Sequence, residues 1–232
     1  MLSRLFLTSA VMLIISFMIS CSGEKSKPAP ETKAQSVQAV NAVTPTEKID
    51  LWNGKDFTGW KKFIPDETID ADQVWTADNG ILKCAGKPSG YIRTTGEYSN
   101  YKLTVVWRWP AKAGNSGVLL HMTGEDKVWP KSIEAQLESG NAGDFWLIGG
   151  NEIAEHTDKS SRRIVKKADS SEKPLGEWNT YKIICKDNTI TLYVNDVLQN
   201  KATETSVKAG KICFQSEGAP IDFKQIYLEP LD

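Results

Sequence analysis

The chain has 232 residues, a formal net charge of −1, 25% charged residues and 40% hydrophobic residues, which is the composition of one globular domain with additional sequence. This composition excludes a wholly disordered chain, and the near-neutral charge argues against a nucleic-acid-binding protein, which would carry a basic stripe. The two histidines and four cysteines form no CxxC or HExxH pattern, which argues against a structural zinc site. The eight tryptophans indicate a β-rich core or a surface that stacks on sugars.

Residues 1–20 have the pattern of a secretory signal peptide. Arg4 precedes an uncharged run from Leu5 to Ile19, which is shorter than the roughly 20 residues that span a bilayer. The run leads into Met18-Ile19-Ser20-Cys21, which resembles a bacterial lipobox. The resemblance implies cleavage before Cys21 and lipidation of its sulfur. A plain signal peptide with an incidental cysteine is the alternative.

Residues 21–48 are predicted to be the lipidated cysteine and a flexible linker. The segment from Ser22 to Glu47 contains no aromatic residue and is rich in Ala, Pro, Thr, Ser and Gln. Such a segment cannot bury enough apolar surface to fold. We therefore expect a protein of the bacterial cell envelope that is attached to a membrane by its acyl chains, on the periplasmic face or at the cell surface.

Residues 49–232 are predicted to form the folded domain, and their pattern is almost entirely that of β-strands. Asp78-Asn79-Gly80 separates two apolar runs, which is a strong signal for a β-hairpin. The other strand-like runs are Tyr101–Trp109, Gly117–Met122, Ser132–Ser139, Tyr181–Lys186, Thr189–Val194, Gly210–Gln215 and Ile221–Leu228. Many short strands without any 3.6-residue periodicity predict an all-β domain, and its length favours a two-sheet antiparallel jelly-roll sandwich.

The segment from Gly140 to Pro174 departs from this strand pattern. It carries mixed charge, including Arg162 and Arg163, and we expect a solvated flap or a hairpin over a cleft. A role for Arg162 or Arg163 in holding substrate is the sharper alternative.

The strand Ser132–Ser139 carries the clearest chemical signal. Its residues alternate between an apolar face and a face formed by Glu134, Gln136 and Glu138. Two carboxylates flanking an amide are typical of a concave sheet that binds saccharides, and a solvated outer face is the alternative. The spacing E-x-Q-x-E resembles the E-x-D-x-E signature of the family-16 glycoside hydrolases, which are concanavalin-A-like jelly rolls with a glutamate nucleophile and a glutamate acid/base.

Geometry keeps that retaining mechanism as an alternative rather than the main reading. Positions i and i+4 on a flat strand are about 13 Å apart, whereas a retaining pair needs carboxyl groups about 5–5.5 Å apart. The middle aspartate of the signature is also replaced here by Gln136.

A broader resemblance covers nearly the whole domain. Leu51–Trp60 reads LWNGKDFTGW and resembles the L-F-N-G-K-D-L-x-G-W opening of the 3-keto-disaccharide hydrolase domain family. Later segments resemble that family's motifs in order: Asn115–Gly117, Ile133–Gln136, Pro174–Asn179, Val194-Asn195 and the closing run from Gly210 through Gly218 to Phe223. Asp196 and Gln225 depart from the family's usual Gly and Asn. The resemblance implies a concanavalin-A-like lectin/glucanase fold that acts on oxidised sugars.

The implied reaction needs one base, an oxyanion stabiliser and an acid. A ketone at C3 acidifies the proton on C2, so a base can remove that proton, the glycosidic oxygen leaves C1, and water then adds. We expect Glu134 to be the base, Gln136 to orient the sugar or polarise the ketone, and Glu138 to be the acid or a sugar ligand. His121, expected on the non-core face of its strand, is a further catalytic candidate because its pKa lies near neutral pH.

Further candidates for binding sugar are three polar residues and two tryptophans. Turn chemistry is the alternative for Asn115, and a solvated face is the alternative for the late strand with Gln215 and Glu217. They are Asn115, Gln215, Glu217, Trp129 and Trp146, the last two expected in loops.

The expected partners are a saccharide and a membrane reached through the lipid anchor, and a partner oxidoreductase that makes the keto sugar is compatible with this reading. No cofactor is expected; a calcium ion occurs in some jelly rolls, but no DxDxDG-like run indicates a site. The sugar, its linkage and the oligomeric state are left open. A non-catalytic carbohydrate-binding lipoprotein with the same fold is the main alternative.

Overall fold

The computed structural model describes residues 41–231, so the expected signal peptide, Cys21 and most of the expected linker lie outside the described residues. Within this range the chain forms fifteen strands and one short 3₁₀ helix, η1 (Ala71–Gln73). The strands are β1 (Ile49–Asp50), β2 (Trp60–Phe63), β3 (Trp75–Asp78), β4 (Ile81–Cys84), β5 (Gly90–Thr94), β6 (Tyr101–Arg108), β7 (Gly117–Thr123), β8 (Lys131–Gln136), β9 (Phe145–Ile148), β10 (Arg163–Ile164), β11 (Asn179–Lys186), β12 (Thr189–Val194), β13 (Val197–Ala202), β14 (Lys211–Ser216) and β15 (Ile221–Glu229).

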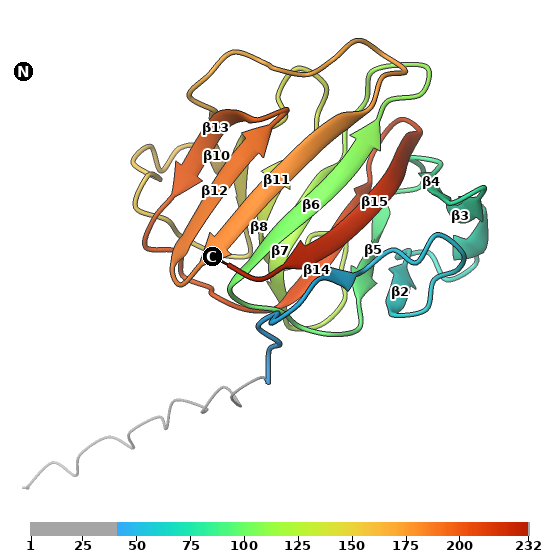
Figure 1. Cartoon of the computed structure of the whole chain (residues 1–232), viewed down its shortest axis with the longest axis horizontal. Coiled ribbons are helices and arrows are strands. Elements are labelled where there is room, and N and C mark those ends of the chain that lie inside the picture. Colours follow the sequence, from blue (N-terminus) through green and yellow to red (C-terminus); the bar gives the residue numbers. More distant parts are fainter. Residues whose placement is uncertain (1–40, 232) are drawn as a thin grey trace, which may run out of the picture. The chain divides into compact units, whose positions relative to one another are not determined.

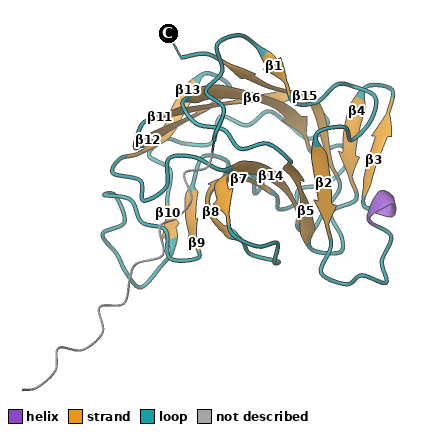
Figure 2. Cartoon of the chain, turned by 90° about the horizontal axis from the view of Figure 1, so that it is seen from below, coloured by secondary structure: helices purple, strands orange, loops and turns teal. Residues whose placement is uncertain are grey.

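The strands form two antiparallel sheets that stack face to face (Figures 1 and 2). The first, here the β6 sheet, has the order β13-β12-β11-β6-β15-β4-β3, with β1 added beside β15. The second, here the β8 sheet, has the order β10-β9-β8-β7-β14-β5-β2. The all-β, two-sheet antiparallel sandwich predicted from the strand pattern is confirmed. No helix within residues 41–231 has the length and hydropathy of a membrane span.

The core lies between the two sheets and follows from period-two alternation. Leu103, Val105 and Trp107 are fully buried on one face of β6. The β8 sheet contributes Phe214, whose ring lies 5.0 Å from that of Phe223 in the β6 sheet. Edge-to-face aromatic packing of this kind adds stability beyond the apolar area that it buries.

The hairpin at Asn79-Gly80 forms as predicted. β3 pairs with β4, and the two turn residues have φ angles of 52° and 81°. Both angles are positive, as a tight two-residue hairpin requires, and Asn and Gly tolerate them better than other residues.

Two expectations about local structure are wrong, and one is settled between its alternatives. Strand β8 ends at Gln136, so the expected alternation does not reach Ser139. Of the flap and the hairpin expected for Gly140–Pro174, the structure has the hairpin, because β9 and β10 pair antiparallel and extend the β8 sheet. Trp146 therefore lies in a strand, β9, rather than in a loop.

Contacts with the sandwich also begin before residue 49. The backbone N–H of Val43 donates to the carbonyl of Glu97, and Ser99 N–H donates to the carbonyl of Val43. The folded unit thus includes the last residues of the segment expected to be linker.

Candidate functional site

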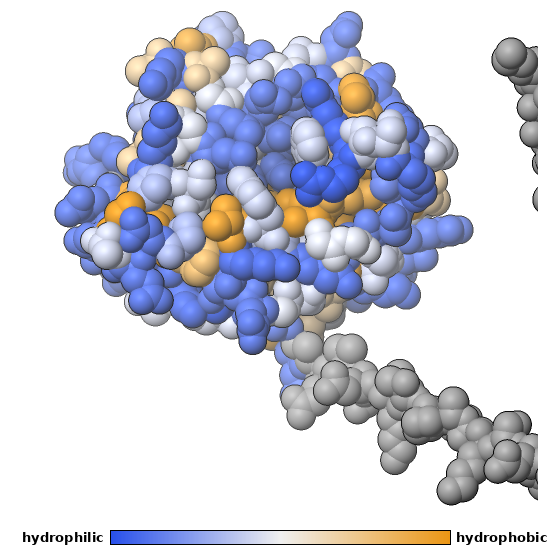
Figure 3. All heavy atoms as spheres, turned by 180° about the vertical axis from the view of Figure 1, so that it is seen from behind, coloured by the Kyte–Doolittle hydropathy of each residue, from blue (hydrophilic) through white to orange (hydrophobic). Residues whose placement is uncertain are grey.

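The face of the β8 sheet that points away from the β6 sheet carries a cavity of about 310 Å³. Figure 3 shows the molecule from this side, where hydrophilic surface surrounds patches of apolar atoms. The cavity lining combines carboxyl groups, amides, aromatic rings and a guanidinium. The lining residues are Asn115, Trp129, Glu134, Gln136, Trp146, Ile148, Arg162 and Glu217. Six of the expected site residues are therefore brought together in one place.

Glu134 lies at the floor of this cavity. It is in β8, where alternation turns Ile133 and Ala135 into the core and Glu134 away from it. The side chain is only 5% exposed, and its Oε1 has no hydrogen-bond partner. Burial, and then the charges of Glu217 and Glu138, raise the pKa of Glu134 well above the usual value of a glutamate, against the lowering effect of Arg162. Glu134 therefore holds a proton strongly in the absence of a ligand.

Gly117 in β7 makes room for this carboxyl group. A Cβ at residue 117 would lie 2.3 Å from Oε1 of Glu134 and 2.2 Å from Oε1 of Gln215. The Gln215 side chain is 1% exposed, and both its polar atoms lack a partner. Buried polar groups are normally paired, so these unpaired atoms point to a polar ligand as their missing partner. Gln215 is thus placed beside Glu134, although it is not part of the cavity lining.

Glu217 is the second titratable group of the cavity. It follows β14 directly, and bridges to Asn115 hold the chain there. Burial, and then the charge of Glu138, raise the pKa of Glu217 to about 7. Asn115 also lines the cavity, and its Oδ1 is buried without a partner. A carboxyl group with this pKa exchanges a proton readily near neutral pH.

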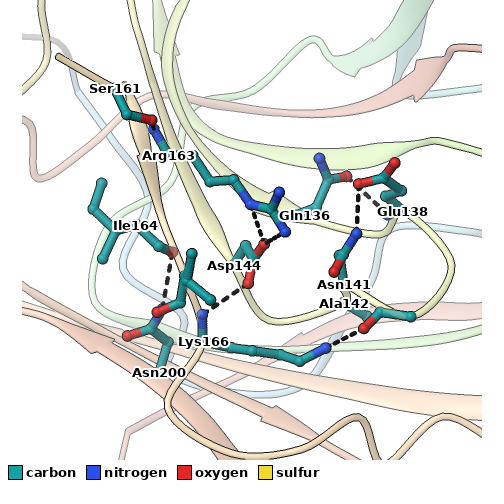
Figure 4. A network of polar contacts seen from close by, with 12 residues as sticks. Gln136, Glu138, Asn141, Ala142, Asp144, Ser161, Arg163, Ile164, Lys166 and Asn200 are labelled. Atoms are coloured by element: carbon teal, nitrogen blue, oxygen red, sulfur yellow. Dashed lines mark hydrogen bonds and ion pairs between the residues drawn. The ribbon is translucent and has the colours of Figure 1, made fainter.

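Gln136 lines the cavity, whereas Glu138 lies outside its lining. The Oε1 of Gln136 accepts from the backbone N–H groups of Leu137 and Glu138, both at 2.8 Å, so its amide nitrogen is the group left for a ligand. Glu138 lies beyond the end of β8 and does not line the cavity. Its carboxylate accepts from Asn141 at 2.8 Å (Figure 4). Glu138 acts on the site through its charge.

Arg162 lines the cavity, whereas its neighbour Arg163 is held in an ion pair outside the cavity lining. The neighbouring Arg163, in β10, pairs with the fully buried Asp144 at 2.6 Å, and Asp144 also accepts from the backbone N–H of Lys166 (Figure 4). Arg162 directly precedes β10, and it is Arg162 rather than Arg163 that lines the cavity. Of the two arginines considered from the sequence, Arg162 is therefore at the site and Arg163 is structural.

Two tryptophans form the walls of the cavity. Trp129 lies in the loop between β7 and β8 and is 42% exposed. Trp146, in β9, has the guanidinium of Arg162 at 5.9 Å from its ring centre, and its Nε1 is buried without a partner. Flat rings with an N–H donor suit the faces and hydroxyl groups of a sugar.

His121 is not at the site, and its expected place on the non-core face is wrong. Pairing between β7 and β8 shifts after Leu120, and His121 has a φ of 54°. This bulge exchanges the faces of His121 and Met122. His121 is 1% exposed, and its ring lies 5.6 Å from that of Tyr101 in the core. Burial lowers its pKa to about 4, so it is neutral at physiological pH.

The sequence reasoning did not single out Ile148 and Gly117 as site residues. The only signal for Gly117 was its place in the Asn-Ser-Gly motif. Within residues 41–231, no group of three or more His, Cys, Asp or Glu side chains is arranged to hold a metal ion.

The first prediction concerns Gly117. Gly117→Ala should lower kcat at least about 10-fold, because the added methyl group displaces Glu134 and Gln215, and misplacement of about 1 Å can cost up to 100-fold. Folding should persist, since the clashing atoms are the ends of flexible side chains. Steady-state kinetics and thermal unfolding measure the two effects.

Gly96→Ala is the matched control for this change. A Cβ there meets no atom closer than 3.1 Å, the hydroxyl oxygen of Tyr98. Equal activity of the Gly117→Ala variant and the wild type would contradict the role given to Gly117.

Comparison with known proteins agrees with this geometry. Residues 47–229 match the 3-keto-alpha-glucoside-1,2-lyase-like domain family. A 3-keto-disaccharide hydrolase of Bacteroides thetaiotaomicron is 24% identical, over 84% of this chain and 77% of that protein.

Solved structures share the fold. A protein of Parabacteroides distasonis, provisionally described as a glycosyl hydrolase, matches with a TM-score of 0.59 and 23% identity, over 80% of this chain and 94% of that chain. The β-glucanase of Bacillus licheniformis matches with a TM-score of 0.53 and 16% identity, over 80% of this chain and 99% of that chain. The concanavalin-A-like jelly roll is thereby confirmed. Since the family match spans all fifteen strands, the chain belongs to the 3-keto-alpha-glucoside-1,2-lyase-like domain family.

Proposed function

We propose that this protein cleaves the glycosidic bond of 3-keto-glycosides, with 3-keto-disaccharides as the substrate class, by elimination followed by hydration. The observation that carries the proposal is the pair of carboxyl groups, Glu134 and Glu217, whose pKa values are both raised within one cavity. The names of the family and of the Bacteroides relative support the substrate class and the elimination.

The chemistry requires little more than two proton transfers. A base takes the proton from C2, which the ketone at C3 acidifies, and an enolate forms. The C1–O bond then breaks, and the departing oxygen takes a proton from an acid. Water adds to C1 of the resulting enone and completes a net hydrolysis. No covalent bond to the protein is needed, so the carboxyl groups need no fixed retaining separation.

The two environments indicate which carboxyl group does what. Glu134 is the more buried, and the charge of Glu217 disfavours its ionisation, so the pair loses its first proton from Glu217. Near neutral pH this leaves an ionised Glu217 and a protonated Glu134. We therefore assign Glu217 as the base and Glu134 as the acid, which reverses the role that the sequence suggested for Glu134.

The other groups of the cavity stabilise the enolate and hold the rings. The amide nitrogen of Gln136 and the guanidinium of Arg162 are the donors that can face the ketone oxygen as it gains negative charge. The negative charge of Glu138 raises the pKa of Glu217 and strengthens it as a base. A retaining mechanism through Glu134 and Glu138 has no support, because the carboxylate of Glu138 is bound to Asn141 and lies outside the cavity lining.

The second prediction separates acid from base by the leaving group. Glu134→Gln should slow cleavage of a 3-keto-disaccharide by about 100-fold or more, the usual contribution of a general acid. It should slow cleavage of a 3-keto-nitrophenyl glucoside much less, because nitrophenolate leaves without a proton. Glu217→Gln should lose activity on both substrates. Product release measured spectrophotometrically and by chromatography gives the rates.

Glu229→Gln, at the end of β15 and far from the cavity lining, is the control and should keep full activity. If Glu217→Gln keeps activity on the nitrophenyl substrate and Glu134→Gln loses activity on both substrates, Glu134 is the base instead. Cleavage of an unoxidised glucoside would favour an ordinary glycosidase. Sugar binding without any turnover would favour the carbohydrate-binding alternative.

The third prediction is a pH profile. Because the base acts only when ionised, kcat/KM should rise as pH increases through about 7, the pKa of Glu217. It should fall again at higher pH, when Glu134 loses its proton. A rise centred near 4.5, the ordinary glutamate value, would contradict the proposed pair. Initial rates between pH 4 and 10, corrected for spontaneous elimination, decide between the two.

We also propose that the protein is a lipid-anchored enzyme of the bacterial cell envelope. The support is the sequence alone, namely the signal-like residues 1–20 and the lipobox-like approach to Cys21. Its substrate must come from an oxidoreductase that converts a sugar hydroxyl at C3 to a ketone, because the proposed elimination starts from that ketone and does not form it.

The fourth prediction tests the anchor. Cys21→Ser in the full chain should move the protein from the membrane fraction to the soluble fraction after expression in a bacterial host, because the acylated sulfur is lost. Cys84→Ser, at a buried position, is the control for thiol loss and should leave the distribution unchanged. Equal distributions for Cys21→Ser and the wild type would contradict lipidation.

A further inference from the structure

A second apolar cluster lies on the outer face of the β8 sheet. It consists of Tyr91, Leu119, Met122, Ile148 and Cys213, with Phe63 packed against it. Their strand neighbours, such as Ile92, Val118, Leu120 and Phe214, belong instead to the core between the sheets. Alternation therefore turns this cluster away from the sandwich, onto the face that carries the cavity.

These residues are nevertheless shielded from solvent. Tyr91, Leu119 and Cys213 are fully buried, and Ile148 is 5% exposed. Side chains on the outer face of a sheet are buried only where another part of the chain covers them. The loop between β7 and β8, residues 124–130, covers the Tyr91 end of this cluster, because Asp126 in the loop accepts from the Tyr91 hydroxyl at 2.9 Å. Figure 2 shows this loop on the side of the β8 sheet opposite the β6 sheet.

Asp126 fixes this loop to the far edge of the sheet. Its carboxylate accepts from Arg93 Nε at 2.6 Å and Nη2 at 2.9 Å, and from the Tyr91 hydroxyl at 2.9 Å. Lys61 in β2 donates to the same carboxylate at 2.8 Å. Arg93 and Tyr91 are in β5, so the loop leaves β7, crosses β14 and is bound to β5 and β2. We call these four residues the Asp126 clamp.

The clamp is built as a partly buried ion pair rather than a surface contact. The side chains of Asp126 and Arg93 are 14% and 13% exposed. Arg93 binds the carboxylate through two nitrogens, which fixes the geometry as well as the charge. Arg93, Lys61 and Tyr91 also hold the pKa of Asp126 well below its usual range, so the clamp stays ionised at neutral pH.

The same short loop carries a wall of the cavity. Trp129 is three residues after Asp126 and lines the cavity beside Glu134. The loop thus covers the outer face toward β5 and β2, while the cavity is lined from β8 and β9 and from Asn115 and Glu217, beside the ends of β7 and β14. Resting on the proposed function, we propose that the Asp126 clamp closes one end of the sugar site, so that the cavity is a blind pocket for a terminal sugar unit and Trp129 is held as its stacking wall.

Asp126 is accordingly a positioning residue that acts through Trp129. Asp126→Asn keeps the shape and removes the charge of the clamp. It should raise KM for a 3-keto-disaccharide about 5- to 10-fold, the scale of a lost aromatic contact, with kcat within about twofold. It should also release the loop, so that trypsin cleaves after Lys127. Mass spectrometry detects the resulting fragments, and this readout does not depend on enzyme activity.

Two further variants keep the test decisive. Trp129→Ala should raise KM to a similar extent without exposing Lys127 to trypsin, because the clamp stays intact. Asp196→Asn breaks the exposed Lys182–Asp196 pair at 2.6 Å on the other sheet and should change neither readout. If Asp126→Asn unfolds the chain, Lys61→Met is the milder variant, because it removes only the exposed contact from Lys61 to Asp126. It should raise KM and cleavage after Lys127 in the same direction but by less.

Substrate length tests the blind pocket itself. The wild type should cleave a 3-keto-disaccharide and reject a trisaccharide whose internal unit carries the ketone. Asp126→Asn should lower the ratio of disaccharide cleavage to trisaccharide cleavage. Equal cleavage of both by the wild type, or no added cleavage after Lys127 in Asp126→Asn, would overturn the inference. Failure of the wild type to cleave any keto glycoside would instead overturn the proposed function, since the proteolysis readout does not depend on it.

Discussion

The site depends on one steric constraint, the missing side chain of Gly117. Only a glycine in β7 leaves room for the side chains of Glu134 and Gln215 from the neighbouring strands β8 and β14. The three strands are adjacent at the centre of the β8 sheet, where the backbone is held by pairing on both sides. The position of the carboxyl group is therefore set by rigid elements rather than by loops, which is what a proton transfer with strict geometry requires.

Keeping a carboxyl group there lowers the stability of the fold. The pKa of Glu134 is raised in the folded chain above its ordinary value of 4.5. The folded state therefore binds the proton more tightly than the unfolded state. The contribution of Glu134 to the free energy of unfolding is therefore most favourable below about pH 4.5. It is lost as the pH rises toward the pKa that Glu134 has in the folded chain. A buried, unpaired glutamate that is unfavourable at neutral pH is expected at a functional site and is hard to explain as a structural feature.

Much of this arrangement was predictable from the sequence, because strands obey a period of two. The alternation of Ile133 to Gln136 correctly placed Glu134 and Gln136 on the polar face, whereas the sequence left open which of Arg162 and Arg163 lies at the site. The rule failed where backbone pairing shifts. The bulge after Leu120 moves His121 into the core, and the side-chain pattern does not reveal it, because the positive φ of His121 is a property of the folded backbone.

What alternation could not supply is contact between distant segments. Glu138 looked equivalent to Glu134 from spacing, but β8 ends before it, and Asn141 and the turn that follows capture its carboxylate. Glu217 and Asp126 gained their roles only from neighbours far along the chain, Glu138 in one case and Arg93 in the other. Burial makes an ordinary glutamate a proton-exchanging group, whereas the guanidinium of Arg93 keeps an ordinary aspartate ionised against the opposing effect of burial. One side of the β8 sheet thus carries a raised and a lowered carboxyl pKa, the first beside other carboxylates in the cavity and the second on the loop between β7 and β8, beside Arg93 and Lys61.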